Sequence, residues 1–185
     1  MDNKLSEGLH AILKQYQDSL TAKVYDDEND DYDLLMEVFK LTPALKRENR
    51  QYWGRELGMC WQLIVTKLFQ ETRSDFGAAL RFGKDEPCDF VVGQYAIDTK
   101  YRIGSGDSGT LKKFKSYGSL LREKGYEPVF LILREDNLPA AISACKKGTW
   151  QVLVGNETFQ FIKEQSGFDL KTFLSQIKGD YTVDR

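Results

Sequence analysis

The chain has 185 residues, of which 41% are hydrophobic and 29% charged, and its formal net charge is −2. Its length favours a single domain with a sizeable core, and its composition is typical of a globular protein. The near-neutral charge argues against a protein that coats nucleic acid non-specifically, and the lack of a run of eighteen apolar residues argues against a membrane span.

The first residues lack the basic and apolar regions of a signal peptide. The three cysteines, Cys60, Cys88 and Cys145, are spaced too widely to indicate a disulfide framework or a zinc site. We therefore expect a reduced, cytoplasmic environment. The single histidine, His10, lies far from any motif in an amphipathic pattern that predicts a helix over residues 4–21, so carboxylates and lysines are left as the reactive groups.

Six acids occur among the eight residues Asp26–Asp33, and the ordinary explanation of such a run is a solvated loop. A short helix is predicted directly afterwards, over residues 32–40. Thr42 as N-cap and Pro43 in the first turn then predict the start of a long helix that ends near Glu71. We expect this helix to bend near one of two glycines, Gly54 or Gly58.

A hairpin is predicted over residues 87–100, after a short strand over residues 78–82. Two apolar-rich runs flank Gly93 and Gln94 there, and a two-residue loop that starts with glycine suits a type II′ turn. The register that follows from this turn gives the hairpin one apolar face that can enter a core, made of Phe90, Val92, Tyr95 and Ile97.

The opposite face of the hairpin carries Asp89 directly across from Asp98, with Lys100 two residues further along the same strand. At an effective dielectric near 20, two carboxylates roughly 4 Å apart repel each other by about 4 kcal/mol, and a divalent cation would remove this penalty. Lys100 could hold a negative charge or a nucleophilic water beside the cation. The alternatives are an ordinary hairpin with two solvent-facing acids, or a bulge that separates them.

This motif, Pro-x-Asp followed by Asp-x-Lys, resembles the signature of the PD-(D/E)XK nuclease superfamily, which includes many type II restriction endonucleases. It is formed by Pro87, Asp89, Asp98 and Lys100. The resemblance covers roughly residues 50–154, and it implies Mg²⁺-dependent hydrolysis of a phosphodiester bond in double-stranded DNA.

By this resemblance, Asp89 and Asp98 would ligate Mg²⁺, with the backbone carbonyl of Thr99 as a further oxygen. Lys100 would orient or deprotonate the attacking water and bind the phosphate. Superfamily members often carry an extra acid on the helix before the hairpin, and Glu56 resembles it as a catalytic residue or a metal ligand. Glu56 lies on or beside the apolar stripe of the predicted long helix, where an acid is costly to desolvate without a partner. The alternative is a boundary residue that reaches solvent.

A glycine-rich stretch follows Lys100, in which backbone N–H groups can approach a phosphate closely; a flexible connector is the alternative. A helix is then predicted over residues 110–124. Residues 98–124 carry seven lysines and arginines against three acids, a local net charge of +4 that suits a phosphate backbone. The expected DNA contacts are Arg102, Ser105, Lys112, Lys113 and Lys115.

Two continuous apolar runs predict strands that are covered on both faces, with helices between and after them. The predicted ranges are 129–133 and 150–154 for the strands, and 138–146 (capped by Asn137), 157–165 and 169–177 for the helices. A hairpin that feeds a crossover helix and buried strands gives a three-layer α/β/α sandwich with a mixed central sheet, which is also the core of the superfamily. We expect one nuclease domain over residues 1–185, with a helical part to about residue 72 and a catalytic core over about 73–178.

The small size leaves little chain for reading a DNA sequence. This favours the small, strand-cleaving subunit of a heterodimeric type IIS restriction enzyme, which works with a larger partner that recognises the DNA. The acidic run and the net charge fit a subunit that binds DNA weakly alone. A self-sufficient homodimeric type II restriction endonuclease, a junction-resolving or repair nuclease, and a non-catalytic subunit of a DNA complex are the alternatives.

Overall fold

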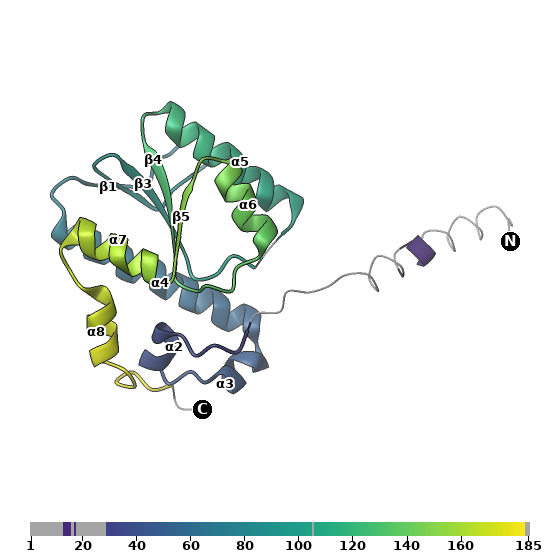
Figure 1. Cartoon of the computed structure of the whole chain (residues 1–185), viewed down its shortest axis with the longest axis vertical. Coiled ribbons are helices and arrows are strands. Elements are labelled where there is room, and N and C mark those ends of the chain that lie inside the picture. The colour runs from purple at the N-terminus through teal and green to yellow at the C-terminus, as the bar shows by residue number, and fades with distance from the viewer. Residues whose placement is uncertain (1–12, 16, 18–28, 105, 184–185) are drawn as a thin grey trace, which may run out of the picture.

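The computed structural model describes residues 13–15, 17, 29–104 and 106–183. Five strands form one sheet in the order β1-β2-β3-β4-β5 (Figure 1). β2 pairs antiparallel with β1 and with β3, whereas β4 pairs parallel with β3 and with β5. The strands are β1 (Phe76–Ala78), β2 (Phe90–Val92), β3 (Tyr95–Lys100), β4 (Glu127–Ile132) and β5 (Gln151–Val154).

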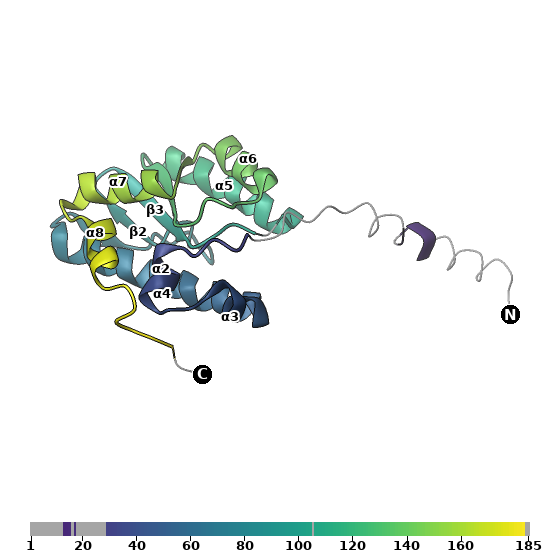
Figure 2. The same cartoon turned by 60° about the horizontal axis from the view of Figure 1, so that its bottom comes forward.

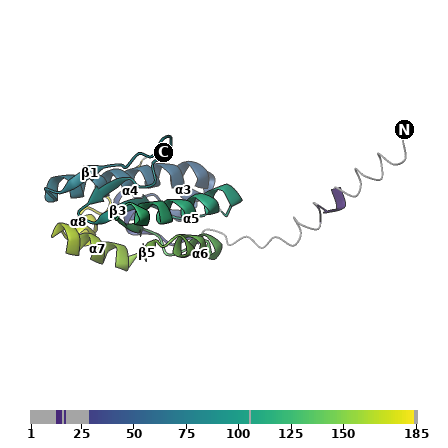
Figure 3. The same ribbon diagram turned by 90° about the horizontal axis from the view of Figure 1, so that it is seen from above.

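Helices cover both faces of this sheet, and the two crossover helices that the parallel connections need, α5 and α6, lie on the same face. Figure 2 shows α3 and α4 on the opposite side of the sheet from α5 and α6, and the view in Figure 3 places α4 and α6 on either side of β3. The first layer contains α2 (Leu34–Val38), α3 (Pro43–Glu48), α4 (Arg50–Thr72), α7 (Asn156–Ser166) and α8 (Leu170–Gln176). The second contains α5 (Ser108–Glu123) and α6 (Pro139–Lys147). The predicted three-layer α/β/α sandwich with a mixed sheet is confirmed.

The β2–β3 hairpin has the predicted register. Phe90 pairs with Ile97 and Val92 pairs with Tyr95, and Gly93 in the turn has a φ of +55°, which favours glycine. All four paired side chains belong to the hydrophobic core beneath α4. Asp98 and Lys100 alternate with Ile97 along β3 and therefore face away from α4.

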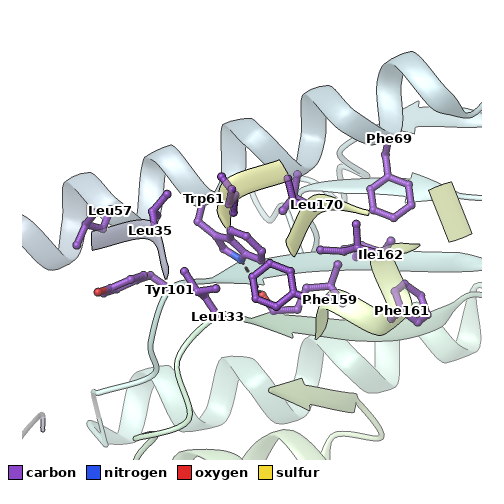
Figure 4. Close-up of a cluster of buried hydrophobic side chains, with 14 of the residues drawn as sticks. Leu35, Leu57, Trp61, Phe69, Tyr101, Leu133, Phe159, Phe161, Ile162 and Leu170 are labelled. Atoms are coloured by element: carbon purple, nitrogen blue, oxygen red, sulfur yellow. Dashed lines mark hydrogen bonds between the residues drawn. The ribbon is translucent and has the colours of Figure 1, made fainter. Parts of the chain in front are cut away.

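The largest core lies between α4 and the sheet (Figure 4). The buried side chains of α4 recur every four residues, at Trp53, Leu57, Trp61, Val65 and Phe69. Trp61 donates its indole N–H to the carbonyl oxygen of Leu131 at 3.1 Å and packs edge-on against Phe159 of α7, with ring centroids 5.7 Å apart. These contacts fix how α4 is rotated against β3.

The predicted long helix is two helices, α3 and α4. Thr42 and Pro43 begin α3 as predicted, but the chain breaks at Asn49, which has φ −154° and ψ 75°. The Asn49 side chain accepts a hydrogen bond from the backbone N–H of Tyr52 at 3.0 Å and so caps α4. Neither Gly54 nor Gly58 interrupts α4, so the predicted bend is wrong.

Two further expectations from the sequence need revision, and a third falls mostly outside the described residues. The first strand is β1, Phe76–Ala78, and not residues 78–82, because it pairs with β2 through Phe76 and Val92. Asn137 does not cap α6: it accepts from the N–H of Ile103 at 2.7 Å and donates to the carbonyl of Arg134 at 2.6 Å. The predicted helix over residues 4–21, which includes His10, lies almost wholly outside the described residues.

The C-terminal segment packs against α2. The backbone N–H groups of Gly179 and Val183 donate to the carbonyl oxygens of Glu37 and Phe39, at 3.0 and 2.9 Å. These bonds satisfy carbonyl groups at the C-terminal end of a very short helix and tie it to the end of the described chain. No helix in the described part of the chain is long and apolar enough to cross a membrane.

A buried guanidinium joins the segment before α2 to the end of β4. The side chain of Arg134 is only 2% exposed, and it donates to Asp33 at 2.8 Å and to Asp136 at 2.7 and 3.0 Å. It also donates to the backbone carbonyl oxygens of Asn29 and Asp31. The described end of the acidic run is thus anchored to the protein, whereas the sequence suggested a solvated loop.

Replacing Arg134 should destabilise the fold strongly. Arg134→Met leaves Asp33 without its cation and Asp136 with Arg102 alone, and the loss of one partner of a buried ion pair costs about 3–5 kcal/mol. Urea denaturation should show this loss, while Arg122→Met, which removes an exposed arginine of α5, should change the midpoint little. Equal midpoints for the two variants would contradict the assigned role.

Candidate active site

The predicted acidic residues lie at the edge of the sheet where the parallel strands end. Asp98 and Lys100 are the fourth and sixth residues of β3, the middle strand of the sheet. Asp89 precedes β2, and its backbone N–H donates at 2.8 Å to the carbonyl of Ile97, the residue that Phe90 already pairs with, so Asp89 does not pair directly with Asp98 as the sequence predicts. The carboxyl edge of parallel strands is where α/β folds bind ligands.

Asp89 is held by three hydrogen bonds. Its Oδ2 accepts from the backbone N–H of Thr99 at 2.7 Å and from the Thr99 hydroxyl at 2.6 Å. Its Oδ1 accepts from the side-chain amide of Gln62, on α4, at 2.7 Å. The carboxylate is therefore fixed between β3 and α4, with its orientation set by both.

Asp98 and Lys100 form an ion pair on β3. The Lys100 ammonium donates to Asp98 Oδ1 and, at 3.2 Å, to the carbonyl oxygen of Thr99. The side chains of Asp98 and Lys100 are 15% and 34% exposed, so both reach solvent at the rim of a largely buried site. Asp98, Thr99 and Lys100 thus lie together on β3, and Asp89 joins them through its hydrogen bonds to Thr99.

The electrostatics of the pair favour a carboxyl group that ionises only at a higher pH than usual and a lysine that stays charged. Burial raises the pKa of Asp98 to about 6, and the negative charge of Asp89 adds to this rise, while Lys100 opposes it. Burial acts to lower the pKa of Lys100, but the charges of Asp98 and Asp89 outweigh burial and raise it. The site therefore has more negative charge than Lys100 alone compensates.

Two buried thiols lie close to this charge. Burial raises the pKa of Cys88 to about 11 and that of Cys145 to about 12, and the charge of Asp98 contributes to both. Both cysteines are free and remain protonated at neutral pH. They belong, with Phe130 of β4, to the apolar cluster behind the site, so they line it without acting as nucleophiles or ligands.

The structure does not bring Glu56 to this site. Its carboxylate contacts Arg55 at 3.0 Å, and it lines an apolar pocket on the side of α4 that faces Leu41 and Val183. The residue of α4 that contacts Asp89 is Gln62, which the sequence analysis missed. The sequence pattern that indicates Gln62 is a stripe of small and polar residues beside the apolar stripe of the helix, at Gly54, Gly58, Gln62 and Thr66.

The predicted DNA contacts differ in their surroundings. Arg102 donates to the carbonyl oxygen of Asp136 at 2.8 Å and to its carboxylate at 3.2 Å, so its guanidinium is held against the protein. Lys112, Lys113 and Lys115 project from the exposed side of α5, and no ion pair among the described residues includes them. Ser105 lies outside the described residues.

The family of the chain follows from a comparison with known proteins. Residues 81–179 match the family described as ApaLI-like restriction endonuclease, a match that spans more than half of the chain and includes the hairpin with its two acids and lysine. The chain belongs to this family. It is a DNA endonuclease of the restriction type, which confirms the resemblance to type II restriction endonucleases. Comparisons with curated proteins and with solved structures gave no match.

The family implies a divalent metal, and the residues present fit one. Within residues 29–104 and 106–183 there is no cluster of three or more acids, histidines or cysteines that could hold a metal. The site of this ApaLI-like endonuclease offers two carboxylates and one backbone carbonyl, all hard oxygen donors, and carries uncompensated negative charge. This set suits Mg²⁺, which is commonly bound by one or two carboxylates and retains several waters.

The variant Asp98→Asn should abolish cleavage and stabilise the metal-free protein. The pKa of Asp98 rises from an ordinary 3.8 to about 6 on folding, so its contribution to stability is fully present below pH 4 and is lost as the pH rises through 6. Above pH 6, Asp98→Asn should therefore be more stable than the wild type, by about 3 kcal/mol at most. Urea denaturation in a chelator from pH 4 to pH 7 measures this. A difference that does not grow with pH would contradict it.

Gln62→Ala should impair cleavage by releasing Asp89 from α4. Loss of a hydrogen bond that orients a metal ligand costs roughly 10- to 100-fold in activity or metal affinity. We expect a lower cleavage rate and a higher Mg²⁺ concentration for half-maximal rate. Gln70→Ala, on the exposed side of the same helix, is the matched control. Glu56→Gln in the same series tests the sequence-based expectation: a larger loss with Glu56→Gln than with Gln62→Ala would favour Glu56.

Proposed function

We propose that this ApaLI-like endonuclease hydrolyses a phosphodiester bond of double-stranded DNA with Mg²⁺ held by Asp89, Asp98 and the carbonyl oxygen of Thr99. The observation that supports this most directly is the placement of Asp98 and Lys100 on β3 beside an Asp89 that Gln62 and Thr99 hold in a fixed direction. A bound cation would offset the electrostatic repulsion between two such carboxylates. When bound, the cation lowers the pKa of a water and offsets charge on the scissile phosphate.

Lys100 is proposed to bind the scissile phosphate and to orient the attacking water. Its ammonium donates to the same two groups, Asp98 and the Thr99 carbonyl, that are proposed to hold the metal. The raised pKa of Lys100 keeps it cationic, and a cation cannot accept a proton. Of the two roles expected from the sequence, orientation of the water is therefore favoured over its deprotonation.

To bind the same metal ion as Asp98, the Asp89 carboxylate needs a fixed direction. Gln62 and Thr99 are proposed to supply it. Both donate to Asp89, one to each carboxylate oxygen. Glu56 remains proposed as a further acid, acting only if it rearranges when metal and DNA bind. The predicted contacts to the DNA backbone stay as proposed, and they are Arg102, Ser105, Lys112, Lys113 and Lys115.

The protein is proposed to cut one strand as the partner of a larger protein that reads the DNA sequence. The described strands and helices are used to build one core and one site, with little chain left over for base recognition. The net charge of −2 also supplies little general attraction to DNA. Reading bases requires side chains placed in a groove, and a second protein would provide them.

Plasmid cleavage tests both the reaction and the partner. With Mg²⁺, the purified chain should nick supercoiled plasmid slowly, and the products of neighbouring genes should increase the rate and the sequence specificity. Lys100→Ala should lower the rate by roughly a hundredfold or more, whereas Lys171→Ala, which removes an exposed lysine of α8, should not.

The alternatives give different outcomes in the same assays. Nanomolar, sequence-specific binding together with double-strand cutting by this chain alone would favour a homodimer and reject the partner. Preference for branched over linear duplexes would favour a junction or repair nuclease. No Mg²⁺-dependent cleavage under any of these conditions would leave a non-catalytic subunit of a DNA complex.

A further inference from the structure

An exposed ionic contact lies beside the proposed active site. The carboxylate of Asp30, in the segment before α2, contacts Arg47 of α3 at 2.5 Å and Arg50 of α4 at 3.9 Å. The side chains are 57%, 46% and 37% exposed, in that order. One carboxylate thus sits between two guanidinium groups in contact with solvent.

This contact is not needed to hold the segment in place. The neighbouring residues Asn29 and Asp33 already bind the buried guanidinium of Arg134. Asn29 also donates its backbone N–H to Asp136 at 3.0 Å. An exposed ion pair adds little stability to such an anchor, because solvent screens it and both side chains lose freedom. Asp30 can therefore leave Arg47 and Arg50 while the rest of the segment remains.

The two arginines lie next to the end of the catalytic strand. Arg50 and Gly54 of α4 line an open pocket of about 380 Å³, and across it lie Tyr101 and Gly104 of the chain that follows β3. Tyr101 is the residue directly after Lys100. No atom lies within 4 Å of the position that a Cβ on Gly54 would take, so α4 leaves open space there. The pocket thus lies between Arg50 and the chain that directly follows the catalytic strand.

The chemistry of this pair suits phosphate. Guanidinium groups bind carboxylate and phosphate oxygens with the same planar, charge-assisted hydrogen bonds. A DNA phosphate can therefore take the place of Asp30 without a change in the arginines' geometry. The exchange replaces one anion by another, so the arginines are never left without an anion.

We propose that Arg47 and Arg50 bind backbone phosphates of the DNA strand on the α4 side of the active site, and that Asp30 occupies this site until DNA displaces it. The proposal rests on the proposed DNA cleavage at Asp89, Asp98 and Lys100. By this proposal, Asp30 in the segment before α2 competes with the DNA substrate for the two arginines. Arg47 and Arg50 therefore bind DNA only when a backbone phosphate displaces the Asp30 carboxylate.

Binding measurements with matched variants test this. Each variant is made in the Asp98→Asn background, and its affinity for a short fluorescent duplex is measured by anisotropy without Mg²⁺. Asp30→Asn and Asp31→Asn remove the same charge from the same segment, but only Asp30 contacts the arginines; Asp31 accepts from the side chain of Asn29. We expect Asp30→Asn to bind about two- to fivefold more tightly than Asp31→Asn. Equal affinities would overturn the competitor role.

The salt dependence tests the arginines. Each lost phosphate contact lowers the slope of log affinity against log salt by about 0.9. The double variant Arg47→Gln/Arg50→Gln should therefore lose nearly two units of slope, and Asp30→Asn should have no effect in it. The pair Arg55→Gln/Lys171→Gln, which removes two exposed charges elsewhere, should keep the slope. Equal slopes for the two double variants would overturn the phosphate site, and thermal denaturation checks that both are folded.

Cleavage by the wild type separates this proposal from the proposed function. If the wild type cleaves DNA but the Asp30 and arginine variants behave like their controls, only the phosphate site is rejected. If the wild type neither binds nor cleaves DNA, both proposals are rejected. Cleavage by Arg47→Gln/Arg50→Gln at saturating DNA, with a weakened affinity, supports binding as the role of these residues.

Discussion

The pairing register of the β2–β3 hairpin is the constraint on which the site depends. Phe90 and Ile97 face the core beneath α4, so Asp98 and Lys100 necessarily face the other way. A slip by one residue would turn Phe90 and Ile97 toward the layer of α5 and α6, and the charged side chains into the core beneath α4. The free energy of core packing therefore keeps two like charges close together, which neither residue would favour by itself. In this chain, packing of the hydrophobic core offsets the electrostatic repulsion within the site.

Much of the fold was predictable because its determinants are local. The turn at Gly93 and the alternation of side chains on either side specify the hairpin, and the continuous apolar runs specify β4 and β5. The errors arose where a distant partner decides. β1 is located by its pairing with β2, and Asn137 bonds to the loop after β3, so neither could be derived from neighbouring residues.

The same division applies to the site. Asp89, Asp98 and Lys100 follow from hairpin geometry, which a short stretch of sequence contains. The contribution of α4 depends on how the helix is rotated against the sheet, and Trp61 sets that rotation through its contacts with Leu131 and Phe159. Six residues along a helix correspond to a turn of roughly 240° about its axis, so Glu56 and Gln62 cannot face the same neighbour. A motif identifies an acid on this helix, but only packing decides which side chain reaches the hairpin.

The hydrogen bonds between α2 and residues 179–183 have a consequence for how the protein is made. They join parts of the chain that are far apart in sequence, and contacts of this kind form late because a long loop must close first. The hairpin, by contrast, needs only its own short stretch of chain. On a ribosome, the catalytic strands can therefore pair while α2 is still waiting for residues that have not been synthesised. The segment before α2 can bind Arg134 once that residue has been synthesised, whereas the carbonyl groups of Glu37 and Phe39 gain these partners only when the chain is nearly complete.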